Sequence, residues 1–161
     1  MKGRYFRKSL RLPDYDYSQP GVYFVTMVTQ NRKQLFGHIT GGEMILSDAG
    51  RMVDQTCREV PIFMVGVRLE CFQVMPDHIH MMIEIEAFEN VSGTNVGANV
   101  GATLCGCPEG RLQPVSENFN RVSLPKIVAR FKSLTTRRYI DGVNQNNWLR
   151  FENRLWQRNY Y

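Results

Sequence analysis

The sequence of 161 residues lacks long apolar stretches, since its apolar runs are six residues or fewer. A helix that spans a bilayer needs about 20 predominantly apolar residues, so no membrane-spanning segment is expected. The basic N-terminus has no apolar region behind it and does not have the pattern of a secretory signal. We therefore expect a soluble, cytoplasmic protein without a membrane partner.

Cysteine is scarce, and the four residues present are poorly spaced for pairing or for zinc. Cys105 and Cys107 form Cys-Gly-Cys rather than the two-residue spacing usual for zinc, while Cys57 and Cys71 stand alone. This pattern is evidence against a disulfide framework or a zinc knuckle. We interpret the four side chains as buried or incidental thiols.

Acidic residues are rare at both ends of the chain. Residues 1–13 carry five basic and no acidic side chains, residues 14–120 carry six basic and 13 acidic, and residues 121–161 carry nine basic and two acidic. The net charge of +5 therefore combines two basic ends with an acidic middle. Basic clusters that include aromatic residues suit phosphate neutralisation, although a solvated basic surface would have the same composition.

The hydrophobic pattern predicts a single domain of mixed α and β structure. Residues 1–20 are expected to form an irregular basic arm, and strands are predicted over 22–29, 63–74, 78–86 and 148–161. Ser47 and Ser123 are expected to cap two helices, the first of which would end at Pro61, and a short hairpin is expected within 34–46.

This order of elements is β, α, β, β, α, β. It predicts an α+β, ferredoxin-like split βαβ sandwich, in which both helices cover one face of an antiparallel sheet. Residues 87–120 are rich in Gly, Asn, Ser and Thr and contain a tandem Asn-Val-Gly-Ala repeat. We expect them to form an expanded flexible surface loop of the same domain, which spans residues 1–161.

The second predicted helix has a basic stripe as well as an apolar one. Lys126, Arg130, Ser133 and Arg137 fall on a narrow stripe about 130° from the apolar one, as calculated at about 100° per residue. No acidic residue occurs between Val122 and Ile140, whereas an exposed helix face usually mixes both signs. The stripe fits either a nucleic-acid contact or an ordinary solvated face.

Two of the three histidines, His78 and His80, lie two positions apart in a predicted strand. Residues i and i+2 of a strand point to the same face, so the two imidazoles share the face opposite to Ile79. Such a pair can converge on one cation that polarises a phosphate, but two ligands do not complete a coordination shell. A hydrogen-bonded pair of strand histidines has the same sequence pattern.

The segment Val74-Met75-Pro76-Asp77-His78-Ile79-His80-Met81-Met82-Ile83 resembles the signature of single-tyrosine transposases of the HUH nuclease superfamily. Within that superfamily it is most similar to the REP-associated tyrosine transposases. Three further segments resemble the family in the same order, namely residues 46–51, 124–133 and 155–161. Together the matching segments cover most of the chain outside residues 87–120.

The resemblance implies that the protein cleaves and rejoins DNA. In the family a tyrosine hydroxyl attacks single-stranded DNA near a hairpin or REP-like palindrome and forms a 5′-phosphotyrosine link, which conserves the bond energy for resealing. It also implies that His78 and His80 bind Mg²⁺ or Mn²⁺ and that the bacterial protein forms a homodimer. We expect DNA contacts from Arg4, Arg7, Lys8, Lys126, Arg130, Lys132, Arg137 and Arg158.

The chain departs from the family at its end. The family nucleophile lies on a helix that follows the last strand, with a further polar metal ligand about one turn later, whereas this sequence stops at Tyr161. Tyr139, Tyr160 and Tyr161 do not match the nucleophile position, so we expect this chain to lack both groups. Two alternatives are therefore a decayed transposase and a non-catalytic single-stranded nucleic-acid-binding module, because ferredoxin-like sheets also stack bases on aromatics. A third is a small metal-binding or interaction protein that does not contact DNA.

Overall fold

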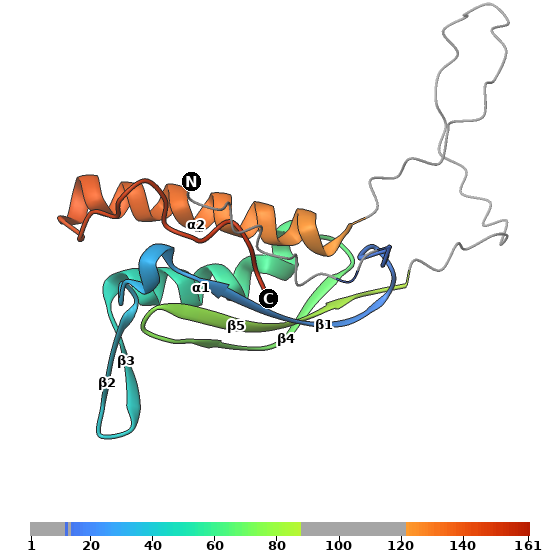
Figure 1. Ribbon diagram of the computed structural model, residues 1–161, viewed down its shortest axis with the longest axis horizontal. Coiled ribbons are helices and arrows are strands. Elements are labelled where there is room, and N and C mark those ends of the chain that lie inside the picture. Colours follow the sequence, from blue (N-terminus) through green and yellow to red (C-terminus); the bar gives the residue numbers. More distant parts are fainter. Residues whose placement is uncertain (1–11, 13, 88–121) are drawn as a thin grey trace, which may run out of the picture. The chain divides into compact units, whose positions relative to one another are not determined.

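The structure, a computed structural model, describes residues 12, 14–87 and 122–161. The expected DNA contacts of Arg4, Arg7 and Lys8 and nearly all of the expected loop at 87–120 lie outside these residues. The elements are β1 (Gly21–Val28), a short 3₁₀ helix (Gln30–Arg32), β2 (Gly37–Thr40), β3 (Glu43–Leu46), α1 (Asp48–Phe63), β4 (Val67–Val74), β5 (His78–Ile85) and α2 (Leu124–Asn146) (Figure 1).

The main sheet has three antiparallel strands in the order β1-β5-β4. Figure 1 shows α1 and α2 on the same side of this sheet. The predicted α+β split βαβ sandwich is therefore confirmed. No helix in the described part of the chain is long and apolar enough to cross a membrane.

The side of the sheet that faces the helices forms the core. On β5, Ile79, Met81 and Ile83 are at most 1% exposed, and they alternate with half-buried residues of the opposite face. The helices contribute buried residues such as Val53 and Phe131 to the same core. This alternation matches the period of two along a strand. Within residues 14–87 and 122–161, no helix covers the other face of the sheet.

Helix α1 begins at Ser47 as predicted. The Ser47 hydroxyl donates to the Leu35 carbonyl at 2.8 Å and accepts the Gly50 N–H at 3.1 Å, which satisfies one free donor of the first turn. A Cβ on Gly50 would lie 2.0 Å from the Phe36 carbonyl oxygen, so only glycine allows this close approach. The predicted end at Pro61 is wrong, because the helix continues through Pro61 and ends at Phe63. A proline in the last turn removes only one hydrogen bond.

Helix α2 begins after Ser123, with Pro125 in its first turn, and it ends at Asn146, after which Asn147 caps it in the left-handed conformation. The predicted apolar stripe is buried at Ile127, Phe131 and Thr135. Between β1 and α1, β2 and β3 form the expected hairpin, which closes through Gly41 and Gly42 at positive φ.

The predicted strand over 148–161 is wrong as a regular strand. Trp156 forms an isolated bridge with Thr29, the Gln157 N–H donates to the Val28 carbonyl at 2.9 Å, and Tyr161 exchanges two hydrogen bonds with Thr26. The five residues 157–161 of this terminal segment thus lie opposite the three residues 26–28 of β1. The excess residues leave the ladder, because the carbonyls of residues 157–159 accept hydrogen bonds from Lys132 on α2.

Candidate functional site on the open sheet face

Both histidines of β5 lie on the face of the sheet away from the helices. His78 and His80 are half-buried, and they alternate with the core residues Ile79 and Met81. In the register of the sheet, His80 lies opposite Thr26 of β1 and Gln73 of β4. The structure therefore brings the two predicted metal ligands to one face, as the spacing of two predicts.

The two imidazoles converge through the same ring atom. The Nε2 atoms of His78 and His80 are 3.1 Å apart, and the rings meet edge to face with centroids 4.7 Å apart. Two nitrogens bound to one ion at about 2.0–2.3 Å and at right angles would be about 3 Å apart. The separation of the Nε2 atoms thus fits two adjacent ligands of a single cation.

The other nitrogen of each ring is held by a neighbouring side chain. His78 Nδ1 lies 2.6 Å from Asp77 Oδ1, and His80 Nδ1 lies 2.9 Å from Thr26 Oγ1. A carboxylate can only accept, so Asp77 fixes the proton of His78 on Nδ1 and leaves its Nε2 as a lone pair. Metal-binding histidines usually have such an outer partner, which orients the ring and raises its basicity.

Burial and the neighbouring His78 lower the pKa of His80 below its ordinary value. The imidazole of His80 therefore stays neutral near pH 7, as a metal ligand must. Among the described residues, no group of three His, Cys, Asp or Glu side chains is placed to hold a metal ion. The described part of the chain thus supplies two ligands of a coordination shell.

The same distances also fit a hydrogen bond between the two histidines. If the Thr26 hydroxyl donates to His80 Nδ1, the His80 proton lies on Nε2 and points at the lone pair of His78 Nε2. The Thr26 hydroxyl can rotate to accept instead, which returns the His80 proton to Nδ1. One side chain therefore lets the pair exist either as a hydrogen-bonded couple or as two metal ligands.

A basic pocket of about 1160 Å³ lies beside the histidine pair, at the edge of the sheet that the terminal segment follows. It is lined by Gln30, Asn31, Arg32, Asn153, Arg154, Gln157, Arg158, Asn159 and Tyr161. Two contacts join it to Asp77 and Thr26, the residues that hold the pair. Arg32 Nη1 lies 3.4 Å from Asp77 Oδ2, and Tyr161 is bonded through its backbone to Thr26.

The charge of this pocket, which we call the arginine pocket, is of one sign. Its lining holds Arg32, Arg154 and Arg158 and no acidic side chain. Arg32 faces Asp77, whereas neither Arg154 nor Arg158 takes part in an ion pair among the described residues. Guanidinium groups arranged in this way suit a phosphate, because their planar donors match its oxygens in pairs.

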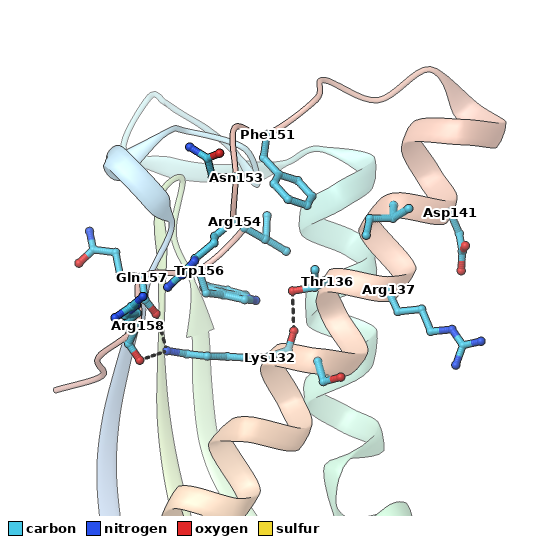
Figure 2. Close-up of a pocket in the computed structure, with 13 residues that line it drawn as sticks. Lys132, Thr136, Arg137, Asp141, Phe151, Asn153, Arg154, Trp156, Gln157 and Arg158 are labelled. Atoms are coloured by element: carbon cyan, nitrogen blue, oxygen red, sulfur yellow. Dashed lines mark hydrogen bonds between the residues drawn. The ribbon is translucent and has the colours of Figure 1, made fainter.

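A second pocket of about 750 Å³ lies between α2 and the terminal segment, and it shares Asn153, Arg154, Gln157 and Arg158 with the first (Figure 2). Figure 2 shows Arg137 on α2 pointing away from these residues. Lys132 extends toward the terminal segment instead, and its Nζ lies 2.8 Å from the Gln157 carbonyl oxygen and 5.8 Å from the centre of the Tyr160 ring.

Three of the five predicted DNA contacts on the described residues, namely Lys132, Arg137 and Arg158, line the second pocket, whereas Lys126 and Arg130 do not. Lys126, Arg130 and Arg137 are exposed on α2, on the side of the sheet opposite to the histidines, and Arg130 packs over the Phe63 ring at 5.4 Å. Only Arg158 lies in the arginine pocket. Their roles in DNA binding stay predictions, and the geometry gives Lys132 a structural role in holding the terminal segment.

Sequence reasoning missed Arg32, Arg154 and Phe24. The Phe24 ring is 61% exposed and stacks on His80, with ring centres 5.3 Å apart and planes 22° apart. Arg32 and Phe24 lie on or beside β1, and their proximity to the histidines follows from the pairing of β1 with β5. The basic composition of residues 154–158 was the one signal that pointed to Arg154.

No family model matches this chain. A protein of Haemophilus influenzae, described as uncharacterized, is 34% identical over 163 residues, which cover 99% of this chain and 78% of that protein. The crystal structure of a "putative transposase" from Deinococcus radiodurans shares 18% identity over 94% of this chain and 82% of its own, with a TM-score of 0.47. At that TM-score the likeness carries no conclusion about function.

Proposed function

We propose that this chain, which belongs to the same family as the Haemophilus influenzae protein, binds single-stranded or hairpin DNA and holds a phosphodiester for metal-dependent strand cleavage and rejoining. The observation that carries the proposal is the 3.1 Å convergence of the His78 and His80 Nε2 atoms beside an arginine pocket without acidic residues. The resemblance of residues 74–83 to the HUH transposase signature supports the same chemistry.

In this proposal, the side chains around the histidine pair and those of the arginine pocket have different roles. Asp77 and Thr26 hold the two imidazoles so that their Nε2 atoms converge. Mg²⁺ or Mn²⁺ bound there would supply positive charge that polarises a phosphate oxygen. Arg32, Arg154 and Arg158 bind the neighbouring phosphates, which fixes the strand beside the histidines. In the family that residues 74–83 resemble, the attacking group is a tyrosine hydroxyl on a helix after the last strand, a position that we expect no residue of this sequence to match.

Metal binding can be tested by titration with Mn²⁺, followed through the paramagnetic broadening of the histidine ring protons. His38 lies exposed on β2 and serves as a reference within the same molecule. We expect the signals of His78 and His80 to broaden at Mn²⁺ concentrations that leave His38 sharp. In the variant His78→Ala, His80→Ala the selective site should be lost while the circular dichroism spectrum is kept, because both side chains lie outside the core.

Two results would overturn the metal site. Equal broadening of all three histidines would mean that the pair has no preference for the ion. Global unfolding of the double variant, with the His38→Ala control folded, would mean that the pair is a structural hydrogen-bonded couple.

DNA chemistry needs a separate assay, with a hairpin that carries single-stranded tails and with Mn²⁺ present. A covalent protein–DNA adduct on a denaturing gel would show that a tyrosine of this chain acts as nucleophile. Binding without cleavage would favour the second candidate, a non-catalytic single-stranded nucleic-acid-binding module, which the exposed Phe24 ring on the open sheet face also supports.

A further inference from the structure

The open face of the sheet carries exposed aromatic side chains directly beside the histidine pair. Phe24 is 61% exposed although it lies in the middle of β1, and its ring is nearly parallel to that of His80. Tyr161 is 45% exposed. Because Tyr161 and Thr26 exchange two backbone hydrogen bonds, their side chains share one face, which is also the face of His80.

The arginine pocket adjoins these aromatic side chains. Tyr161 lines that pocket together with Arg154 and Arg158. Flat apolar rings next to guanidinium groups suit one class of ligand, a single-stranded nucleic acid, whose bases stack on aromatics while its phosphates bind the basic groove. At the other end of the same face, Glu84 lies opposite Val22. The negative charge of its carboxylate repels the phosphates of a nucleic acid there.

We propose that Phe24, with Tyr161 as a second ring, is a stacking site for an unpaired nucleobase whose neighbouring phosphates occupy the arginine pocket. The inference rests on the proposed function and adds to it the part of the substrate that the sheet face contacts. It also sets the path of the bound nucleic acid, which extends from Phe24 toward Arg158 and not toward Val22.

The test measures the affinity of the purified chain for a fluorescent single-stranded oligonucleotide in the presence of EDTA, so that no metal contributes. The variants are Phe24→Ala, Phe24→Leu and Phe24→Trp, with Val22→Ala as the matched control on the same strand and face. Leucine keeps the apolar area but removes the π-face, while tryptophan keeps a ring. All positions are exposed, so each variant should stay folded.

Loss of one stacked base corresponds to about 5- to 150-fold in affinity. We expect Phe24→Ala and Phe24→Leu to lose affinity in this range, Phe24→Trp to retain it and Val22→Ala to match the parent protein. The slope of affinity against salt should not change in the Phe24 variants, because no phosphate contact is lost, whereas Arg158→Ala should make it shallower by about one counterion.

The outcomes separate the two proposals. If the parent protein binds and Arg158→Ala weakens binding while Phe24→Ala does not, the stacking site is wrong and the proposed function stands. If the parent protein does not bind the oligonucleotide, the stacking site and the DNA-binding part of the proposed function both fail. If Phe24→Ala instead turns a dimer into a monomer in sedimentation, with Phe24→Leu still dimeric, the face is a contact between two copies of the chain.

Discussion

The two faces of the three-stranded sheet are built from the same strands, but one face forms the core and the other carries the candidate site. On β5, Ile79 and Met81 are at most 1% exposed under the helices, while His78 and His80 on the other face keep part of their surface open. On β1, Val25 is buried and its neighbour Phe24 is 61% exposed. Adjacent residues of one strand thus belong either to the core or to the candidate site.

The difference shows which residues the fold requires and which it leaves available. A residue on the helix side must be apolar and must fit a packed interior. A residue on the open side has no such constraint. Packing in the core therefore does not explain why a large aromatic ring stands there. The histidine pair, the Phe24 ring and the arginine pocket all lie on or beside the open side.

The largest expected effect is the loss of stability when a residue on the core face is truncated. Ile79→Ala removes a fully buried side chain, which should lower the free energy of unfolding by about 2–5 kcal/mol because a cavity remains. Phe24→Ala, on the open face, should change it by less than about 0.5 kcal/mol. Urea denaturation of both variants measures the two values, and equal losses would mean that the open face is packed as tightly as the core.

A smaller effect is expected at the residue that orients His78. Asp77→Asn keeps the size of the side chain but removes the charge that Asp77 places beside His78 Nδ1. Loss of such an outer partner typically costs about 10- to 100-fold in metal affinity, which a Mn²⁺ titration can measure. Asp54→Asn, which breaks an ion pair with Arg58 on α1, is the matched control. Unchanged affinity in Asp77→Asn would remove the carboxylate from the site.

The sequence sufficed for the elements whose pattern is local. Alternation along 78–86 predicted both the strand and the face that carries the histidines, and Ser47 marked the start of α1. Pro61 gave a wrong end for α1, because a helix can continue for a few residues past a proline in its final turn. The prediction of a strand over 148–161 was wrong as well, because the carbonyls of residues 157–159 accept hydrogen bonds from Lys132 rather than from β1.

The rest of the candidate site depends on contacts between distant parts of the chain. Phe24 meets His80, and Arg32 meets Asp77, only through the pairing of β1 with β5 across more than 40 positions. Arg158 joins them because residues 155–161 return along the free edge of β1. No periodicity within one segment carries this information, so Arg32 and Phe24 could not be assigned from the sequence.

The smallest expected effect concerns Lys132, which was predicted to contact DNA but holds the terminal segment against α2. Because this side chain is only half-buried, Lys132→Met should lower the free energy of unfolding by about 1 kcal/mol. Arg137→Met, at an exposed position of the same helix, should leave it unchanged within about 0.5 kcal/mol. Hydrogen exchange at the Gln157 and Tyr161 amides should quicken only in Lys132→Met, since these amides bond to β1.

The same pair of variants decides between the two roles of Lys132. A residue that binds phosphate directly should reduce the salt slope of oligonucleotide binding by about one counterion when it is removed. A residue that only positions Arg158 and Tyr161 should weaken binding together with the loss of amide protection, and it should leave that slope almost unchanged. A shallower slope in Lys132→Met with full protection of the Gln157 amide would restore the original prediction and would place a DNA contact on the helix side of the sheet.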